Sequence, residues 1–243
     1  MKSRYMLLLA GLLPLSAAAQ QPALSQAGTA GQANLNALVA GAPTIVPHGN
    51  NEAVVGSPYL ENRWLPARLK MSNNVPLAPV PLKFDVLNQR LLMQPLDRPT
   101  DSLQLNDRLV AGFELEEPAT PLAPGRTRRF RRFAEAPDPR QQAEYVEVLH
   151  KGRYTLLKRY TKQFIKGDSH QAYGSSRNYD EIKDGNQYYL LRPDKTLVPL
   201  KLTMKMLQAA APELASTLKA APGAGTAKTD AQWAAVLAAA EAN

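Results

Sequence analysis

The chain lacks cysteine altogether, although it has 243 residues. This absence excludes disulfides, thiolate metal ligands, a thiol nucleophile and a lipid-modified N-terminal cysteine. The fold must therefore be held by its apolar core alone. A chain of this length, with 44% hydrophobic residues, buries a sizeable core without cross-links and predicts about one or two domains.

Histidine is scarce as well. The three histidines, His48, His150 and His170, are not placed at the spacing of metal ligands. The pair Gly223 and Gly225 lacks the preceding strand and the third glycine of a dinucleotide-binding loop. We therefore predict neither a metal nor an organic cofactor.

Long hydrophobic runs are missing except near the N-terminus, where Tyr5 to Leu15 is shorter than the about 20 residues that cross a bilayer. Lys2 and Arg4 precede this run, and small residues follow it through Ala19. A charged, then apolar, then small-residue order is typical of a secretory signal peptide. We therefore predict residues 1–19 as a cleaved signal peptide, with no transmembrane segment in the mature chain. The mature protein is then periplasmic, extracellular or on the cell surface.

Acidic residues are fewer than basic ones, 21 against 29, so the formal net charge is +8. The charge falls to +6 once Lys2 and Arg4 leave with the signal peptide. A basic exported protein is attracted to anionic material such as lipid headgroups, lipopolysaccharide and acidic polysaccharide. The charge indicates a class of partner rather than a function.

Three zones follow the signal peptide. Residues 20–56 are rich in Ala, Gly, Asn and Gln without sustained periodicity, which predicts a flexible low-complexity segment. Residues 57–202 carry short apolar and β-branched runs separated by turn residues, which predict a β-rich domain. Residues 203–243 carry helix start signals at Thr203, at Pro212 and at Thr229 or Asp230, which predict a helical C-terminal tail.

The strands expected in the β-rich domain are short and closely spaced. They cover residues 64–71, 80–86, 90–94, 101–105, 109–116, 127–134, 144–150, 154–160, 162–166, 187–192 and 197–200. Glycine-containing turns at His150-Lys151-Gly152-Arg153 and Lys183-Asp184-Gly185-Asn186 would join consecutive strands as hairpins. We therefore predict an α+β fold, in which an antiparallel β meander, curled into a sandwich or a partial barrel, precedes the helical tail.

The densest charge cluster places five arginines and two phenylalanines within eight residues, Arg126 to Phe133. Guanidinium groups beside aromatic rings hold phosphates or sulfates, so this run is a candidate anion-binding site. The candidate residues are Arg126, Arg128, Arg129, Arg131 and Arg132. The alternative, which we favour from the sequence, is a charged edge strand in which Phe130 is buried. Because an exported protein seldom meets nucleic acid, an anionic envelope component is the expected ligand of such a site.

Two acidic clusters offer a different chemistry. One contains Asp180, Glu181 and Asp184, and the other contains Glu114, Glu116 and Glu117. Paired carboxylates act as acid and base in glycoside cleavage, so a secreted polysaccharide hydrolase is the alternative function. Charged loops are more often simply solvated, and we give the non-enzymatic hypothesis precedence.

Several short motifs, taken in order, resemble an uncharacterised family of exported envelope proteins common in Bacteroidota. They are Gly56-Ser57-Pro58-Tyr59-Leu60, Pro81 to Asp85 with Asn88 and Arg90-Leu91-Leu92, then Tyr145, Val148-Leu149, Gly152, Leu156-Leu157-Lys158 and Tyr188-Tyr189. The resemblance runs from Gly56 to the C-terminus and implies an envelope location without any activity or site residues. The Ala-rich tail departs from the family pattern. The sequence thus predicts an exported, non-enzymatic envelope protein that contacts anionic surface polymer, lipid headgroups or a protein partner.

Overall fold

A computed structural model describes residues 54–74, 77–95, 99–121, 123–167 and 179–242. The predicted signal peptide, most of the predicted low-complexity segment, His48 and His170 lie outside these residues. The first seven elements are β1 (Val54–Val55), β2 (Leu65–Met71), β3 (Val80–Asp85), β4 (Arg90–Met93), β5 (Leu103–Gln104), the short 3-10 helix η1 (Asp107–Leu109) and β6 (Val110–Glu117). They are followed by β7 (Arg126–Arg132), α2 (Pro139–Gln142), β8 (Tyr145–Lys151), β9 (Thr155–Ile165), β10 (Asp180–Leu191), β11 (Leu197–Leu200), α3 (Met204–Ala210), η2 (Pro212–Leu214), α4 (Ala215–Ala220) and α5 (Asp230–Ala242).

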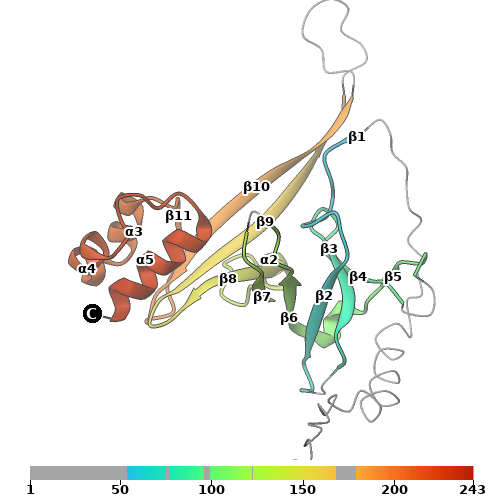
Figure 1. Ribbon diagram of the computed structural model, residues 1–243, viewed down its shortest axis with the longest axis horizontal. Coiled ribbons are helices and arrows are strands. Elements are labelled where there is room, and N and C mark those ends of the chain that lie inside the picture. Colours follow the sequence, from blue (N-terminus) through green and yellow to red (C-terminus); the bar gives the residue numbers. More distant parts are fainter. Residues whose placement is uncertain (1–53, 75–76, 96–98, 122, 168–178, 243) are drawn as a thin grey trace, which may run out of the picture.

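The strands form one 11-stranded sheet in the order β1-β10-β9-β8-β7-β6-β2-β3-β4-β5, with β11 also paired to β10. Every pairing is antiparallel except that of β1 with β10. Helices α3, α4 and α5 gather at one end of the molecule and β2 to β5 at the other, while the long β9–β10 hairpin runs diagonally between them (Figure 1). The predicted α+β fold with an antiparallel meander and helices at the C-terminal end is confirmed.

The sheet curls around a core at the end formed by β2 to β7. Leu65, Ala67, Leu69 and Met71 of β2 are buried, and the three residues between them are exposed. This alternation of apolar and polar residues is what turns one face of a strand to a core. The centre of that core is aromatic. It contains Phe84, Phe113, Phe130 and Tyr145, with the rings of Phe113 and Phe130 stacked 4.6 Å apart.

A second core lies between the sheet and the helices. Leu156 and Leu190 from β9 and β10 meet Leu207 and Leu218 from α3 and α4. The Ala-rich helix α5 contributes only a few large side chains, Trp233, Val236 and Leu237, as its sequence predicts. Alanine elsewhere on α5 lets the helix lie close to its neighbours.

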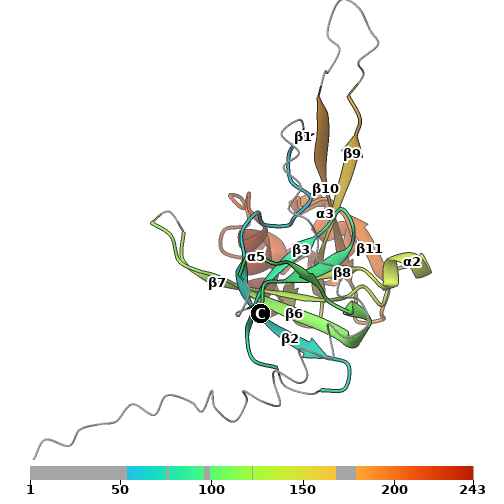
Figure 2. The same ribbon diagram turned by 90° about the vertical axis from the view of Figure 1, so that its right-hand side faces the viewer.

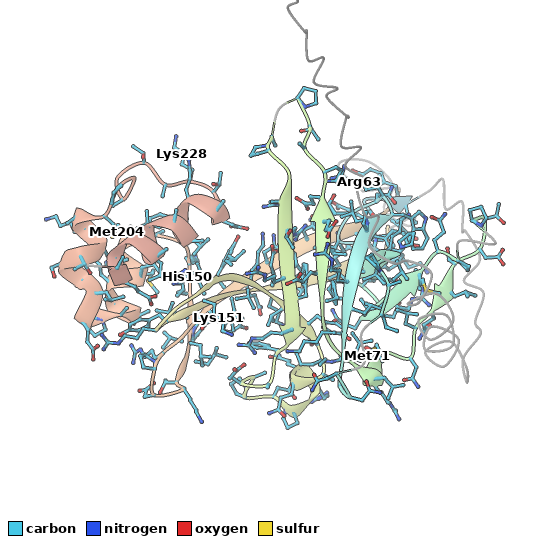
Figure 3. All side chains as sticks on the ribbon, turned by 60° about the horizontal axis from the view of Figure 1, so that its bottom comes forward. Arg63, Met71, His150, Lys151, Met204 and Lys228 are labelled. Atoms are coloured by element: carbon cyan, nitrogen blue, oxygen red, sulfur yellow. The ribbon has the colours of Figure 1, made fainter. Side chains whose placement is uncertain are left out.

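Helix α5 is fastened to the sheet by a carboxylate near each end. At its first turn, Asp230 accepts hydrogen bonds from Lys158 Nζ at 2.6 Å and from the Tyr188 hydroxyl at 2.9 Å. At its last turn, Glu241 accepts a hydrogen bond from the Tyr154 N–H at 2.6 Å and contacts His150 Nε2 at 2.9 Å. Figure 3 shows His150 and Lys151 beside the helices, far from Arg63 and Met71 at the other end.

The turn predicted at Lys183-Asp184-Gly185-Asn186 is wrong, because these residues lie inside β10. They pair in continuous register with β9, and Lys162 forms an ion pair of 2.6 Å with Asp184 across the two strands. A local Asp-Gly signal is therefore overridden by eleven consecutive cross-strand pairs. The turn predicted at residues 150–153 is confirmed, since it joins β8 to β9.

No helix among the described residues is long and apolar enough to cross a membrane.

The fully buried Leu237 provides a test of the helical core. We expect Leu237→Ala to lower the free energy of unfolding by about 2–5 kcal/mol, because it removes buried methyl groups and leaves a cavity. Urea denaturation measures this change. The matched control is Leu109→Ala, a substitution of the same chemistry at a side chain that is 43% exposed, for which about 0.5 kcal/mol or less is expected. Equal losses at the two positions would contradict a core beneath α5.

Candidate functional site

The five candidate arginines all lie in β7, and the pleat of that strand divides them between two faces. Arg128 and Phe130 are buried on the core side, whereas Arg129 between them and Thr127 before them are exposed. Side chains of a strand alternate between faces, so a run of adjacent arginines cannot act as one cluster. Each arginine therefore has to be considered with the neighbours on its own face.

Arg128 is only 4% exposed and forms the centre of a buried network. Its Nε and Nη2 donate to the two carboxylate oxygens of Glu147 at 3.0 and 2.9 Å. Nη1 donates to Glu117 at 2.9 Å and to Glu61 at 3.3 Å, and Nη2 donates also to the Tyr160 hydroxyl at 2.7 Å. A guanidinium has five N–H donors, and all five are used within the protein.

The network also fixes protonation states. Burial alone would lower the pKa of Arg128, but the hydrogen bonds and the charge of Glu147 outweigh it and raise this pKa. Burial, together with the charge of Glu147, raises the pKa of Tyr160. Burial acts to raise the pKa of Glu117, yet the hydrogen bonds from Arg126 and Arg128 prevail and lower it. Arg128 is thus a permanently charged structural residue.

Arg132 and Arg126 are engaged too. Arg132 donates to the carbonyl oxygens of Val110, Ala143 and Asp107, and its guanidinium carbon lies 4.0 Å from the centre of the Tyr145 ring. Arg126 forms an ion pair of 2.5 Å with Glu117. Of the five arginines in the run, Arg129 and Arg131 lie on the outer face of the sheet.

The outer face of β2, β6 and β7 carries a hollow of about 410 Å³. We call this surface the basic sheet face and define it by six residues: Arg68, Lys70, Gly112, Glu114, Arg129 and Arg131. Lys70 lies across from Gly112, which pairs with Arg131, and Arg68 lies across from Glu114, which pairs with Arg129. Two rows of side chains therefore cross three strands.

Gly112 lies between Lys70 and Arg131 and adds no side chain to the hollow. A Cβ atom at this position would lie 2.5 Å from the Phe130 carbonyl oxygen, which is closer than a side chain tolerates. The floor between Lys70 and Arg131 is therefore backbone.

The lining of the hollow is cationic, with four basic side chains and one carboxylate. Arg129 pairs with Glu114 at 3.1 Å, but their side chains remain 70% and 37% exposed. Arg131 pairs at 2.8 Å with Glu135, which lies outside the lining. Lys70 is exposed and has no ion pair with any carboxylate in the described part of the chain. Exposed ion pairs contribute about 0–1 kcal/mol, so a competing anion displaces them at low cost.

A second hollow of about 410 Å³ continues along the same strands. Its lining includes Pro66, Glu116, Glu117 and Arg126, so carboxylates outnumber basic side chains there. Together the two hollows follow β6 from Ala111 to its end at Glu117. The surface is therefore elongated along the strand direction.

Sequence reasoning missed Arg68 and Lys70. They lie in β2, more than 50 positions before β7, and meet Arg129 and Arg131 only because β6 pairs with both strands. The signal that was present is the alternation of β2, in which Arg68 and Lys70 occupy exposed positions between buried ones.

The acidic clusters considered for hydrolysis are occupied by cations. Five of the six carboxylates form ion pairs: Glu114 with Arg129, Glu116 with Arg68, Glu117 with Arg126 and Arg128, Glu181 with Lys183, and Asp184 with Lys162. The sixth, Asp180, accepts a hydrogen bond from the Gly167 N–H. Within the described ranges, no group of three or more acidic or histidine side chains is arranged to hold a metal ion.

Fold and surface together describe an α+β protein with an open, cationic sheet face. Comparison with protein families, with curated proteins and with solved structures finds no match to this chain.

The buried network provides a stability test. We expect Arg128→Gln to lower the free energy of unfolding by about 3–5 kcal/mol, because Glu147 is then buried without its counter-ion. The matched control Arg129→Gln removes the same group from an exposed pair and should cost about 1 kcal/mol or less. Urea denaturation of the two variants measures the difference. Similar losses would show that Arg128 does not hold the strands together.

The lowered pKa of Glu117 predicts a dependence of stability on pH. A carboxyl whose folded-state pKa lies below its ordinary value of 4.5 stabilises the fold above that pH. This contribution is lost as the pH falls through the folded-state pKa. We therefore expect wild type to be more stable than Glu117→Gln at neutral pH, and the difference to shrink as the pH is lowered below 4.5. Thermal unfolding between pH 7 and about pH 3 measures both curves. A difference that is constant with pH would contradict the assignment.

Proposed function

We propose that this chain is an exported, non-enzymatic protein of the cell envelope that contacts an anionic surface polymer through the basic sheet face. Export to the periplasm or the cell surface is supported by the signal-like order of residues 1–19 and by the resemblance to an exported family. The observation that carries the proposal is the hollow at Gly112, where four basic side chains surround a floor of backbone.

The chemistry of the face suits negatively charged groups. Lys70 supplies an ammonium without a counter-ion among the described residues, and Arg129 and Arg131 supply guanidiniums that can bind a phosphate, sulfate or carboxylate through two parallel hydrogen bonds. Glu114 lies within the same lining and is held by Arg129 at 3.1 Å. An incoming anion would take its place on that guanidinium.

The shape of the face suits a polymer better than a single small anion. Residues on one face of a strand recur about every 7 Å, so the two cationic rows, Lys70 with Arg131 and Arg68 with Arg129, are separated by this spacing. When one anionic group of the polymer is bound at one row, the next anionic group is held close to the next row. The binding free energies of the two contacts then combine. A weak contact in each row is therefore sufficient for retention.

Substitution of three basic residues on the basic sheet face tests the proposal. We expect Lys70→Gln/Arg129→Gln/Arg131→Gln to elute from immobilised heparin at a clearly lower salt concentration than wild type, because the local positive charge is lost. The same variant should bind lipopolysaccharide less tightly in a sedimentation assay.

The matched control removes the same charge from the helical end, with Lys195→Gln/Lys205→Gln/Lys219→Gln. All three lysines are exposed and lie outside the basic sheet face. If retention depends only on net charge, the two variants will elute together, and the basic sheet face is then not the contact surface. Retention equal to wild type for the first variant would refute the proposal directly.

A further inference from the structure

The β9–β10 hairpin extends beyond the body of the sheet as an arm (Figures 1 and 2). On its inner side β9 pairs with β10 along its whole length, from Thr155 to Ile165. On its other side β9 pairs with β8 only as far as Arg159. From Tyr160 to Ile165, no strand among the described residues covers this second edge of β9.

The register shows which backbone groups of β9 face the open edge. The Arg192 N–H donates to the Thr196 carbonyl oxygen, so the backbone groups of Arg192 face β11 and point away from β9. Backbone groups alternate in direction along a strand, so every second residue of β10 before Arg192 also points away from β9. The intervening residues of β10, such as Lys183 and Gly185, therefore bond to β9. Their partners on β9 are Gln163 and Thr161.

It follows that Tyr160, Lys162 and Phe164 point their N–H and C=O groups to the open edge. A row of such groups is a template for an added strand. Where Tyr160 to Phe164 pair with Asn186 to Ile182, the arm has only two strands among the described residues. A two-stranded ribbon is only marginally stable in water, so a third strand would reinforce this stretch.

The side chains along this edge indicate which side chains a partner strand would need. Lys162 and Phe164 lie on one face, and Lys166 follows at the same two-residue interval. Phe164 is 47% exposed, and Ile182 lies across from it on β10. Lys162 already holds Asp184 with one of its three N–H donors, whereas Lys166 is exposed. Between Thr155 and Lys166 the strand contains basic residues and no carboxylate.

We propose that the open edge of β9 accepts an extended segment of a partner protein as an added antiparallel strand. The segment carries an apolar side chain opposite Phe164 and carboxylates opposite Lys162 and Lys166. Directly opposed side chains of antiparallel strands stabilise the pair when they are apolar together or opposite in charge. The surface is separate from the basic sheet face and does not depend on the function proposed for it.

A second copy of the chain is a poorer occupant of this edge. Antiparallel pairing of two β9 strands about Phe164 would stack the two rings but place Lys162 opposite Lys166 twice. Like charges directly opposite each other destabilise a strand pair. The basic composition of β9 therefore favours an acidic partner over itself.

A synthetic peptide tests the proposal with the full mature chain. The probe has glutamate, valine and glutamate at alternate positions and threonine between them, with a fluorescent label read by anisotropy. The control peptide carries lysine in place of glutamate. We expect the glutamate peptide to bind and the lysine peptide to bind at least about tenfold more weakly, because two opposed charge pairs change sign.

Two variants at one position separate the backbone contribution from the side chain. Phe164→Pro removes an N–H that faces the open edge and leaves the hydrogen bonds of Gln163 to β10 in place. Phe164→Thr removes the ring and keeps the N–H. We expect the proline variant to bind the glutamate peptide about tenfold more weakly than the threonine variant, with both retaining the thermal stability of a folded chain.

The charge reversal Lys162→Glu/Lys166→Glu, combined with Asp184→Lys so that the cross-strand ion pair is kept in reverse, should invert the preference, so that the lysine peptide becomes the tighter ligand. Equal binding by the proline and threonine variants, or no binding of the glutamate peptide at millimolar concentration, would overturn the proposal. So would a dimer in analytical ultracentrifugation that is lost in Phe164→Pro, because a second copy would then occupy the edge.

Discussion

Five hydrogen bonds from one guanidinium determine how the two ends of this sheet are joined. Arg128 of β7 bonds to Glu147 of β8, to Tyr160 of β9 and to Glu117 of β6. Beside it, Lys158 contacts the Tyr160 ring and holds Asp230 of α5. A polar seam therefore connects the aromatic core of one end to the helical core of the other. Polar networks of this kind are orientation-specific, so they set the angle between neighbouring elements as apolar contacts alone do not.

The same pleat that buries Arg128 exposes its neighbour Arg129. Adjacent residues of β7 thus serve opposite purposes, one holding the interior and the other presenting charge to solvent. Both faces of β7 carry arginines that pair with carboxylates, which makes the run dense. Arg128 pairs with Glu147 on the inner face, and Arg129 pairs with Glu114 on the outer face. Composition alone does not separate these two needs, because they differ only by one position along the strand.

The fold was predictable to a large extent because its signals are local. The alternation at β2 and β3, the Gly152 turn and the Thr203 cap of α3 are each determined by residues close together in the sequence. The structure departs from local signals at Asp184-Gly185, where register with β9 decides the outcome. The candidate surface was only half predictable for the same reason. Arg129 and Arg131 belong to a conspicuous run, but Lys70 joins them through pairings that span distant segments.

The contacts of Glu241 with the β8–β9 turn have a consequence for how the protein folds. His150 and Glu241 are separated by 91 positions, and Gly152 leaves the space that the carboxylate fills. The turn can form early as a hairpin, yet its backbone N–H groups at Arg153 and Tyr154 find their acceptor only after residue 241 has been synthesised. A contact of such sequence separation requires the closure of a long loop, which costs conformational entropy before the contact stabilises the chain. A chain shortened before Glu241 therefore leaves these two N–H groups without their acceptor, and the helical end of the molecule stays unfastened at this turn.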